Sequence, residues 1–228
     1  MTEHKAGSIR KEEICNLSRV PFSITENPCY MTALQCIESD IHFSKTILYQ
    51  HYKNFKCDTL ADFYQIENPV LQKYSYKSSF LPWIHTSPVL QYKDVAFIKR
   101  DDEFILKQVG RIKKLIKSCQ EYGYKPELFP DRKRGHITGY YLESASSKKF
   151  YVVSGNHRVG VVSALFPESN IPIIYEEAAF SKPRDRANRG APYLGMYGYK
   201  NVEKWPAVSS GFITAGLAIK IMEKYTGA

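Results

Sequence analysis

The stretch Phe150 to Phe166, FYVVSGNHRVGVVSALF, decides how this chain is expected to fold. Its first four residues are aromatic or β-branched, a composition that favours a buried strand. From Val159 onward, the apolar side chains recur at spacings that place them on one face of a helix. The polar segment between these parts, Ser154 to Arg158, therefore predicts a turn that leads directly from a strand into a helix.

The predicted turn has the residue types of an anion-binding site. A helix N-terminus exposes backbone N–H groups and carries a partial positive charge. Gly155 allows a ligand to approach the backbone, and Ser154 or Asn156 is expected to cap the helix. Arg158 adds a guanidinium whose donors match phosphate, and His157 is either a phosphate donor or a structural residue of the first turn. The residues alone leave a capped structural turn as the alternative.

The segments around the turn predict a compact unit of helices and strands. Asp102 to Tyr122 carries an apolar stripe at spacings of three and four, which predicts a long helix that Gly123 ends. Ile137 to Glu143 and Lys149 to Val153 predict two strands joined by a polar turn, and Ile171 to Tyr175 predicts another strand. The order helix, strand, strand, helix, strand indicates an α+β fold.

The rest of the chain is expected to surround this unit, which spans residues 94–180. Residues 1–93 predict a helical and irregular extension packed on the core, with residues 1 to about 14 frayed. Residues 181–228 predict a basic loop followed by an amphipathic helix at Ile213 to Tyr225. We expect the three parts to form one compact unit.

The bulk composition indicates a globular protein with an anionic partner. Of the 228 residues, 43% are hydrophobic and 24% charged, which is typical of a soluble domain. No apolar run approaches the roughly 18 residues of a membrane span, and the polar N-terminus does not resemble a secretory signal. Five cysteines without a C-x-x-C pair favour reduced thiols, so we expect a cytoplasmic protein without membrane contact. The net charge of +9 indicates a nucleotide, a phosphorylated compound or a nucleic acid as partner.

Two motifs resemble those of the ParB/sulfiredoxin-like superfamily. Ser118 to Pro126, SCQEYGYKP, resembles the step in which a helix of that superfamily ends at a glycine and is followed by a proline. Val153 to Arg158, VSGNHR, resembles its turn between strand and helix. The order of elements over about Asp94 to Glu177 also agrees. The resemblance implies a small mixed sheet with packed helices, and the Gly-x-His-Arg form is nearest to the branch of free-serine kinases.

By this resemblance, the turn binds the phosphate groups of a nucleotide. The nucleotide would be ATP or ADP, with CTP as a further candidate, and Mg²⁺ would bridge the phosphates and a carboxylate. The residues that would bind it are Ser154, Gly155, Asn156, His157 and Arg158. Sulfiredoxin carries its reactive cysteine at the position of Asn156, so sulfiredoxin chemistry is not expected here.

The resemblance also implies a base for a hydroxyl acceptor. Kinase-like relatives place a catalytic glutamate near the start of the long helix, which makes Glu103 the first candidate, with Asp102 and Asp101 behind it. His157 is a further catalytic candidate through its contact with a phosphate. The alternative is that the three acids only stabilise the N-terminus of the helix.

Two other segments are candidates for the substrate site. Trp83 and His85 lie in an aromatic segment between prolines, which either forms a pocket wall or packs in the core. A later basic segment either closes over an anionic substrate or is solvated, and its candidates are Arg184, Arg186 and Arg189. The substrate would be small and anionic, or bear a hydroxyl group as serine and sugars do. No residues have the spacing of a metal site.

The sequence therefore predicts a small-molecule kinase or ATPase that transfers phosphate to a hydroxyl acceptor. One alternative is a nuclease or nucleic-acid-binding protein, which the net charge and 17 tyrosines favour. Another is a non-catalytic module that senses a nucleotide. No convincing helix-turn-helix follows residue 177, so site-specific DNA binding of the partitioning kind is not expected.

Overall fold

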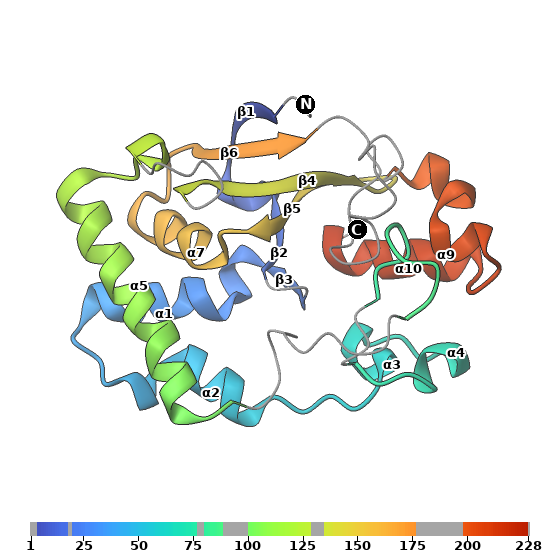
Figure 1. Cartoon of the computed structure of the whole chain (residues 1–228), viewed down its shortest axis with the longest axis horizontal. Coiled ribbons are helices and arrows are strands. Elements are labelled where there is room, and N and C mark those ends of the chain that lie inside the picture. Colours follow the sequence, from blue (N-terminus) through green and yellow to red (C-terminus); the bar gives the residue numbers. More distant parts are fainter. Residues whose placement is uncertain are drawn as a thin grey trace.

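The computed structural model describes most of the chain and has an α+β fold, as the sequence predicts. Within the described part, a six-stranded mixed sheet lies between two groups of helices (Figure 1). The described residues are 4–17, 20–76, 80–88, 100–128, 135–176 and 198–227.

The helices and strands have the following bounds. The strands are β1 (His4–Ile9), β2 (Ile14–Leu17), β3 (Val20–Ser23), β4 (Ile137–Glu143), β5 (Lys148–Ser154) and β6 (Ile171–Glu176). The longer helices are α1 (Pro28–Glu38), α2 (Ile47–Asn54), α5 (Asp102–Tyr122), α7 (Asn156–Leu165) and α10 (Ala215–Thr226). The shorter ones are α3 (Leu60–Tyr64), α4 (Pro69–Gln72), α9 (Pro206–Ser209) and the 3₁₀ turns η1 (Lys11–Glu13), η2 (Ile24–Glu26), η3 (Phe43–Lys45), η4 (Pro126–Leu128) and η5 (Tyr199–Lys204). In the described ranges, no helix is both long and apolar enough to cross a membrane.

The antiparallel hairpin of β4 and β5 forms the centre of the sheet, whose strand order is β1-β6-β4-β5-β2-β3. β6 runs parallel to β4 and β2 runs parallel to β5, so each strand of the hairpin has a parallel neighbour. β1 and β3 are antiparallel edge strands. The two predicted strands at 137–143 and 149–153 and the predicted helix at 102–122 are confirmed as β4, β5 and α5.

The N-terminal segment contributes more to the sheet than its sequence indicates. Residues 4–9, which were expected to be frayed, form β1 and pair with β6 from His4 opposite Glu176 to Ile9 opposite Ile171. Three of the six strands therefore come from the first 23 residues, where a helical and irregular extension was expected. The expectation was wrong because β1 and β2 are stabilised by partners more than 130 residues away, which local composition does not reveal, and β3 then pairs with β2.

Alternating side chains of the hairpin divide the core between the two faces of the sheet. Phe150 and Val152 of β5 pack with Val159 and Val162 of α7 on one face. Tyr151 points to the other face, into the cluster that includes α3, α9 and α10. α7 and α1 cover the first face, and α5 and α2 pack outside them (Figure 1). α7 is thus enclosed by the sheet, α1 and α5.

The crossing of α7 and α1 depends on a glycine. A Cβ atom on Gly160 would lie 2.9 Å from both the carbonyl carbon of Cys29 and the backbone nitrogen of Tyr30. These are backbone atoms at the start of α1, which cannot move like the end of a flexible side chain. Gly160 therefore sets how closely the two helices approach.

We predict that Gly160→Ala destabilises the protein although alanine favours a helix. Forcing a methyl group into this contact should lower the free energy of unfolding by about 1–3 kcal/mol, the usual cost of overpacking. The matched control is Gly110→Ala in α5, where an added Cβ has nothing within 4 Å. That variant should gain up to about 1 kcal/mol from helix propensity alone. Urea unfolding of both variants measures the difference, and equal effects would contradict the proposed role of Gly160.

Candidate anion-binding site at the N-terminus of α7

The turn between β5 and α7 has a backbone conformation that requires glycine. Gly155 has φ 98° and ψ 22°, a left-handed conformation that other residues rarely adopt. A Cβ atom there would also lie 3.1 Å from Cα of Ile137 and 3.4 Å from the carbonyl oxygen of His136. Gly155 therefore brings the first residues of α7 directly beside the start of β4.

The N-terminus of α7 has no side-chain cap. The expectation that Ser154 or Asn156 would cap the helix is wrong, because Gly155 occupies the N-cap position and has no side chain. Ser154 instead belongs to β5, where it pairs with Thr138 of β4. The other described helices of eight or more residues are all capped by a side chain, from Asn27, Thr46, Asp101 and Thr214. The partial positive charge at the first turn of α7 is therefore not compensated by the oxygen of an N-cap side chain.

The charges of two arginines act on His157, which lies in this first turn. Arg158 lies in the turn itself, is half-buried, and makes no ion pair or hydrogen bond within the described ranges. Arg111 comes from α5, where its Nη1 donates to Oε1 of Gln108 at 3.2 Å. Burial, followed by the charges of Arg111 and Arg158, lowers the pKa of His157 from 6.5 to about 4. His157 is therefore neutral at pH 7, and the positive charge of the site comes from the two guanidinium groups and the helix end.

Tyr124 connects the end of α5 to the same site. Its hydroxyl donates to the carbonyl oxygen of Gly135 at 3.0 Å, next to the residues that Gly155 contacts. Burial raises the pKa of this hydroxyl, whereas the nearby charge of Arg158 lowers it. Tyr124 and Arg111 thus extend the site beyond the residues that the sequence indicated.

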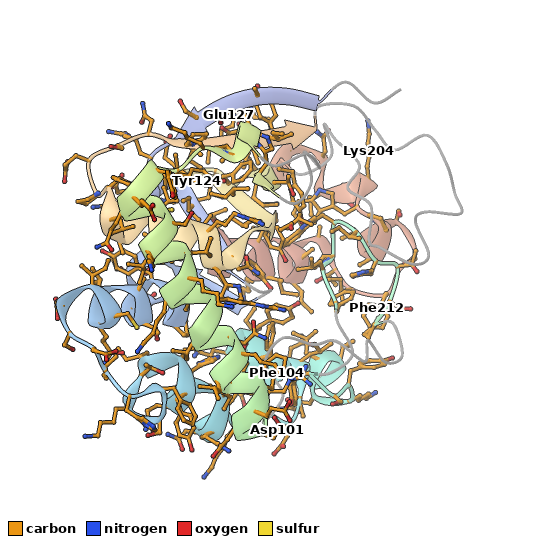
Figure 2. The ribbon with its side chains drawn as sticks, turned by 60° about the vertical axis from the view of Figure 1, so that its left-hand side comes forward. Asp101, Phe104, Tyr124, Glu127, Lys204 and Phe212 are labelled. Carbon is orange, nitrogen blue, oxygen red and sulfur yellow. The ribbon has the colours of Figure 1, made fainter. Side chains whose placement is uncertain are left out.

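The acids proposed as bases lie elsewhere. Asp101 caps α5 by accepting from the N–H of Phe104 at 2.7 Å, and Figure 2 shows both residues at the opposite end of α5 from Tyr124. Asp102 accepts from Lys53 Nζ at 2.5 Å, and this hydrogen bond is the main cause of the lowered pKa of Asp102.

Glu103 is also placed away from the turn. It pairs with Lys107 Nζ at 2.6 Å on the exposed face of α5. It lies eight residues before Arg111, which corresponds to about 12 Å of helical rise. The structure therefore does not bring Glu103 or Asp102 together with Arg158, and the placement favours the alternative that these acids stabilise the start of α5.

Of the proposed substrate residues, Trp83 and His85 are described, and neither is at the turn. Trp83 is fully buried on the other side of the sheet, where its Nε1 donates to the hydroxyl of Tyr140 at 3.0 Å. Its ring meets Trp205 edge-on, with centroids 5.8 Å apart. Of the two alternatives for Trp83, this placement favours packing in the core over a pocket wall, because no face of the ring is accessible. His85 accepts from the N–H of Leu81 at 2.9 Å, and Arg184, Arg186 and Arg189 lie outside the described residues.

Sequence reasoning missed Arg111 because it lies in a basic run that resembles a solvated helix face. Four other cations occur between Lys107 and Lys117, and only the packing of α5 against α7 selects Arg111. Tyr124 enters the sequence analysis only as a residue of the SCQEYGYKP motif. No feature of the neighbouring sequence indicates that its hydroxyl donates to Gly135.

Comparisons with known proteins identify no relative. The chain matches no family model, no curated protein and no solved structure. In the ranges that the structure describes, no three His, Cys, Asp or Glu side chains are grouped to hold a metal ion. The resemblance to the ParB/sulfiredoxin-like superfamily stays a prediction, and the site is defined here by its geometry.

We predict that a bound phosphate raises the pKa of His157. In the free protein, the imidazole should remain neutral until the pH falls to about 4. A phosphate group at the turn would favour the imidazolium and move the pKa upward, toward 6.5 or above. His51 on α2 is the internal control, because burial also lowers its pKa to about 4 and it should not respond. NMR titration of the histidine resonances with and without phosphate measures both, and an unchanged His157 would contradict the prediction.

Proposed function

We propose that this chain is a nucleotide-binding protein whose site for the nucleotide's phosphate groups is the N-terminus of α7. The proposal rests on a helix end without a side-chain cap, where the charges of Arg158 in the same turn and of Arg111 on α5 both act on His157. Backbone N–H groups at a helix end and guanidinium groups are complementary to phosphate, and charge-assisted hydrogen bonds to it are among the stronger ones in proteins. A neutral His157 would donate a further hydrogen bond without adding charge.

The proposal extends to phosphate transfer to a small hydroxyl acceptor, or to nucleotide hydrolysis, because the VSGNHR motif resembles the turn of the free-serine kinases. Most of the catalytic effect in phosphoryl transfer comes from positioning and from neutralising charge, which the two arginines can supply. Glu103 and Asp102 are not included as bases, because each is held by a lysine away from the turn. Binding of an anion is the part of the proposal that the uncapped helix end and the two arginine charges support, whereas the nucleotide and the transfer step rest on the resemblance.

We predict that ATP or ADP raises the melting temperature and that Arg158→Ala removes most of this shift. Losing a charge-assisted hydrogen bond costs about 1.5–3 kcal/mol, so affinity should fall roughly ten- to a hundredfold. Lys220→Ala on α10 is the matched control, because it removes one exposed positive charge on the other side of the sheet. A thermal-shift titration with ATP, ADP and CTP measures all three proteins. If the nucleotide raises the melting temperature of Arg158→Ala as much as that of the native protein, or does not raise that of the native protein, the proposed site is wrong.

The nucleic-acid alternative predicts a different pattern. Binding to DNA or RNA by the net charge of +9 would weaken steeply with salt and would change little in Arg158→Ala. Salt-sensitive DNA binding by a native protein that shows no response to nucleotides would favour this alternative.

For Glu103→Gln, we predict the same nucleotide binding and the same turnover as in the native protein. The substitution breaks only the exposed pair with Lys107, which contributes up to about 0.5 kcal/mol to stability. The measurement is a phosphate-transfer and hydrolysis assay with serine and sugars as acceptors. Loss of turnover with retained binding would show that Glu103 is the base in spite of its position.

A further inference from the structure

One polar side chain is buried within the apolar stripe of α5. Gln108 is 6% exposed and lies three residues after Ile105 and four before Ile112, both of which are fully buried on the same face of the helix. Transfer of an amide from water into such a face costs free energy unless hydrogen bonds replace the lost water. The partner of this amide is therefore informative about its role.

The partner of Gln108 is a charged side chain. Its Oε1 accepts from Nη1 of Arg111 at 3.2 Å, and within the described ranges the Gln108 side chain makes no other hydrogen bond. Ser163 is buried without a partner in those ranges. The other buried Asn and Thr side chains described, and the remaining Ser, bond to backbone groups; they are Asn27, Thr32, Thr46, Ser144 and Thr226. Among these buried residues of the described part, only Gln108 bonds to an ionised group.

The contact between Gln108 and Arg111 lies away from the flank of α5 that carries Lys113. Lys113 is five residues after Gln108, about 140° around the helix, and bonds to the segment that follows α1. α5 also packs against α7, whose Val161 belongs to the same buried cluster as the apolar stripe of α5. His157 lies four residues before Val161, on the same face of α7. This packing and the effect of the Arg111 charge on His157 both indicate that the flank with Gln108 and Arg111 faces α7.

An amide can hold a guanidinium without neutralising it. A carboxylate at position 108 would also accept from Arg111, but its negative charge would compensate the positive charge. One N–H of the Arg111 guanidinium is used by Gln108, and the others make no hydrogen bond within the described ranges. The Arg111 side chain is otherwise exposed, and a side chain that is already held loses less conformational entropy when it binds a ligand.

We propose that Gln108 is a positioning residue of the phosphate site, which holds the guanidinium of Arg111 for the ligand and leaves its charge uncompensated. The inference rests on the proposed nucleotide site. Gln108 would act through Arg111 and would not itself contact the nucleotide. Its substitution should therefore weaken phosphate binding only while Arg111 is present.

The test is a double-mutant cycle of Gln108 and Arg111, in which calorimetry on the full chain measures the affinity for ATP. Gln108→Met keeps a long unbranched side chain and removes the acceptor. It should weaken ATP binding about two- to tenfold, because the ligand must then order the Arg111 side chain itself. In the Arg111→Ala background, Gln108→Met should cause no further loss. A general structural defect would weaken binding in both backgrounds.

Gln108→Glu tests the charge in a second variant. The carboxylate keeps an acceptor for Arg111 but compensates the charge of the guanidinium. The affinity for ATP should therefore fall about tenfold or more, as expected when a charge-assisted hydrogen bond is lost.

Gln120→Met is the matched control, because it makes the same substitution at an exposed position of α5. It should bind ATP like the native protein. Native-like affinity in Gln108→Met, Gln108→Glu or Arg111→Ala overturns the inference, as does an equal loss from Gln108→Met in both backgrounds. The nucleotide site itself stands in these cases if Arg158→Ala still weakens ATP binding. No ATP binding by the native protein overturns the nucleotide site and the inference together.

Discussion

The position of α7 depends on two close backbone contacts that only glycine permits. Gly155 lies against Ile137 at the start of β4, and Gly160 lies against Cys29 at the start of α1. The first contact sets where the helix begins, and the second sets how deeply it packs. Val159 and Val162 then fill the space above the central hairpin. The same two contacts therefore determine the core of this face and the location of the exposed N–H groups.

The candidate site is assembled from elements that are individually ordinary. A glycine at the N-cap leaves the helix end without a side-chain cap, and the charge of Arg111 on α5 acts on His157 in the first turn. The hydroxyl of Tyr124 donates to the carbonyl oxygen of Gly135, next to the residues that Gly155 contacts. Because His157 is neutral, a bound anion would meet two fixed charges on two different helices.

The sequence pattern within a segment was sufficient to predict the elements that depend mainly on contacts between neighbouring residues. The bounds of α5 follow from its apolar stripe, the capping Asp101 and the terminal Gly123, and the central hairpin follows from its composition and its polar turn. Features that depend on distant partners were missed or misplaced. The sequence of β1 is polar enough to suggest a frayed end, yet it pairs with β6. For Trp83 the sequence left a core residue and a ligand contact as alternatives, and its burial favours the core residue. Arg111 is one of several cations on α5, and only tertiary packing distinguishes it.

The pairing of β1 with β6 has a consequence for how the protein is made. The hydrogen bonds of β1 cannot form before residues 171–176 have been synthesised, whereas β2 can pair with β3 at once and meets β5 only later. During synthesis, residues 171–176 must leave the ribosome before β1 has its partner. Closing such long loops is entropically costly and slows folding relative to chains with local contacts. Among the described strands, β1 is therefore the one whose partner is synthesised longest after it, and its unpaired backbone is open to mispairing in the newborn chain.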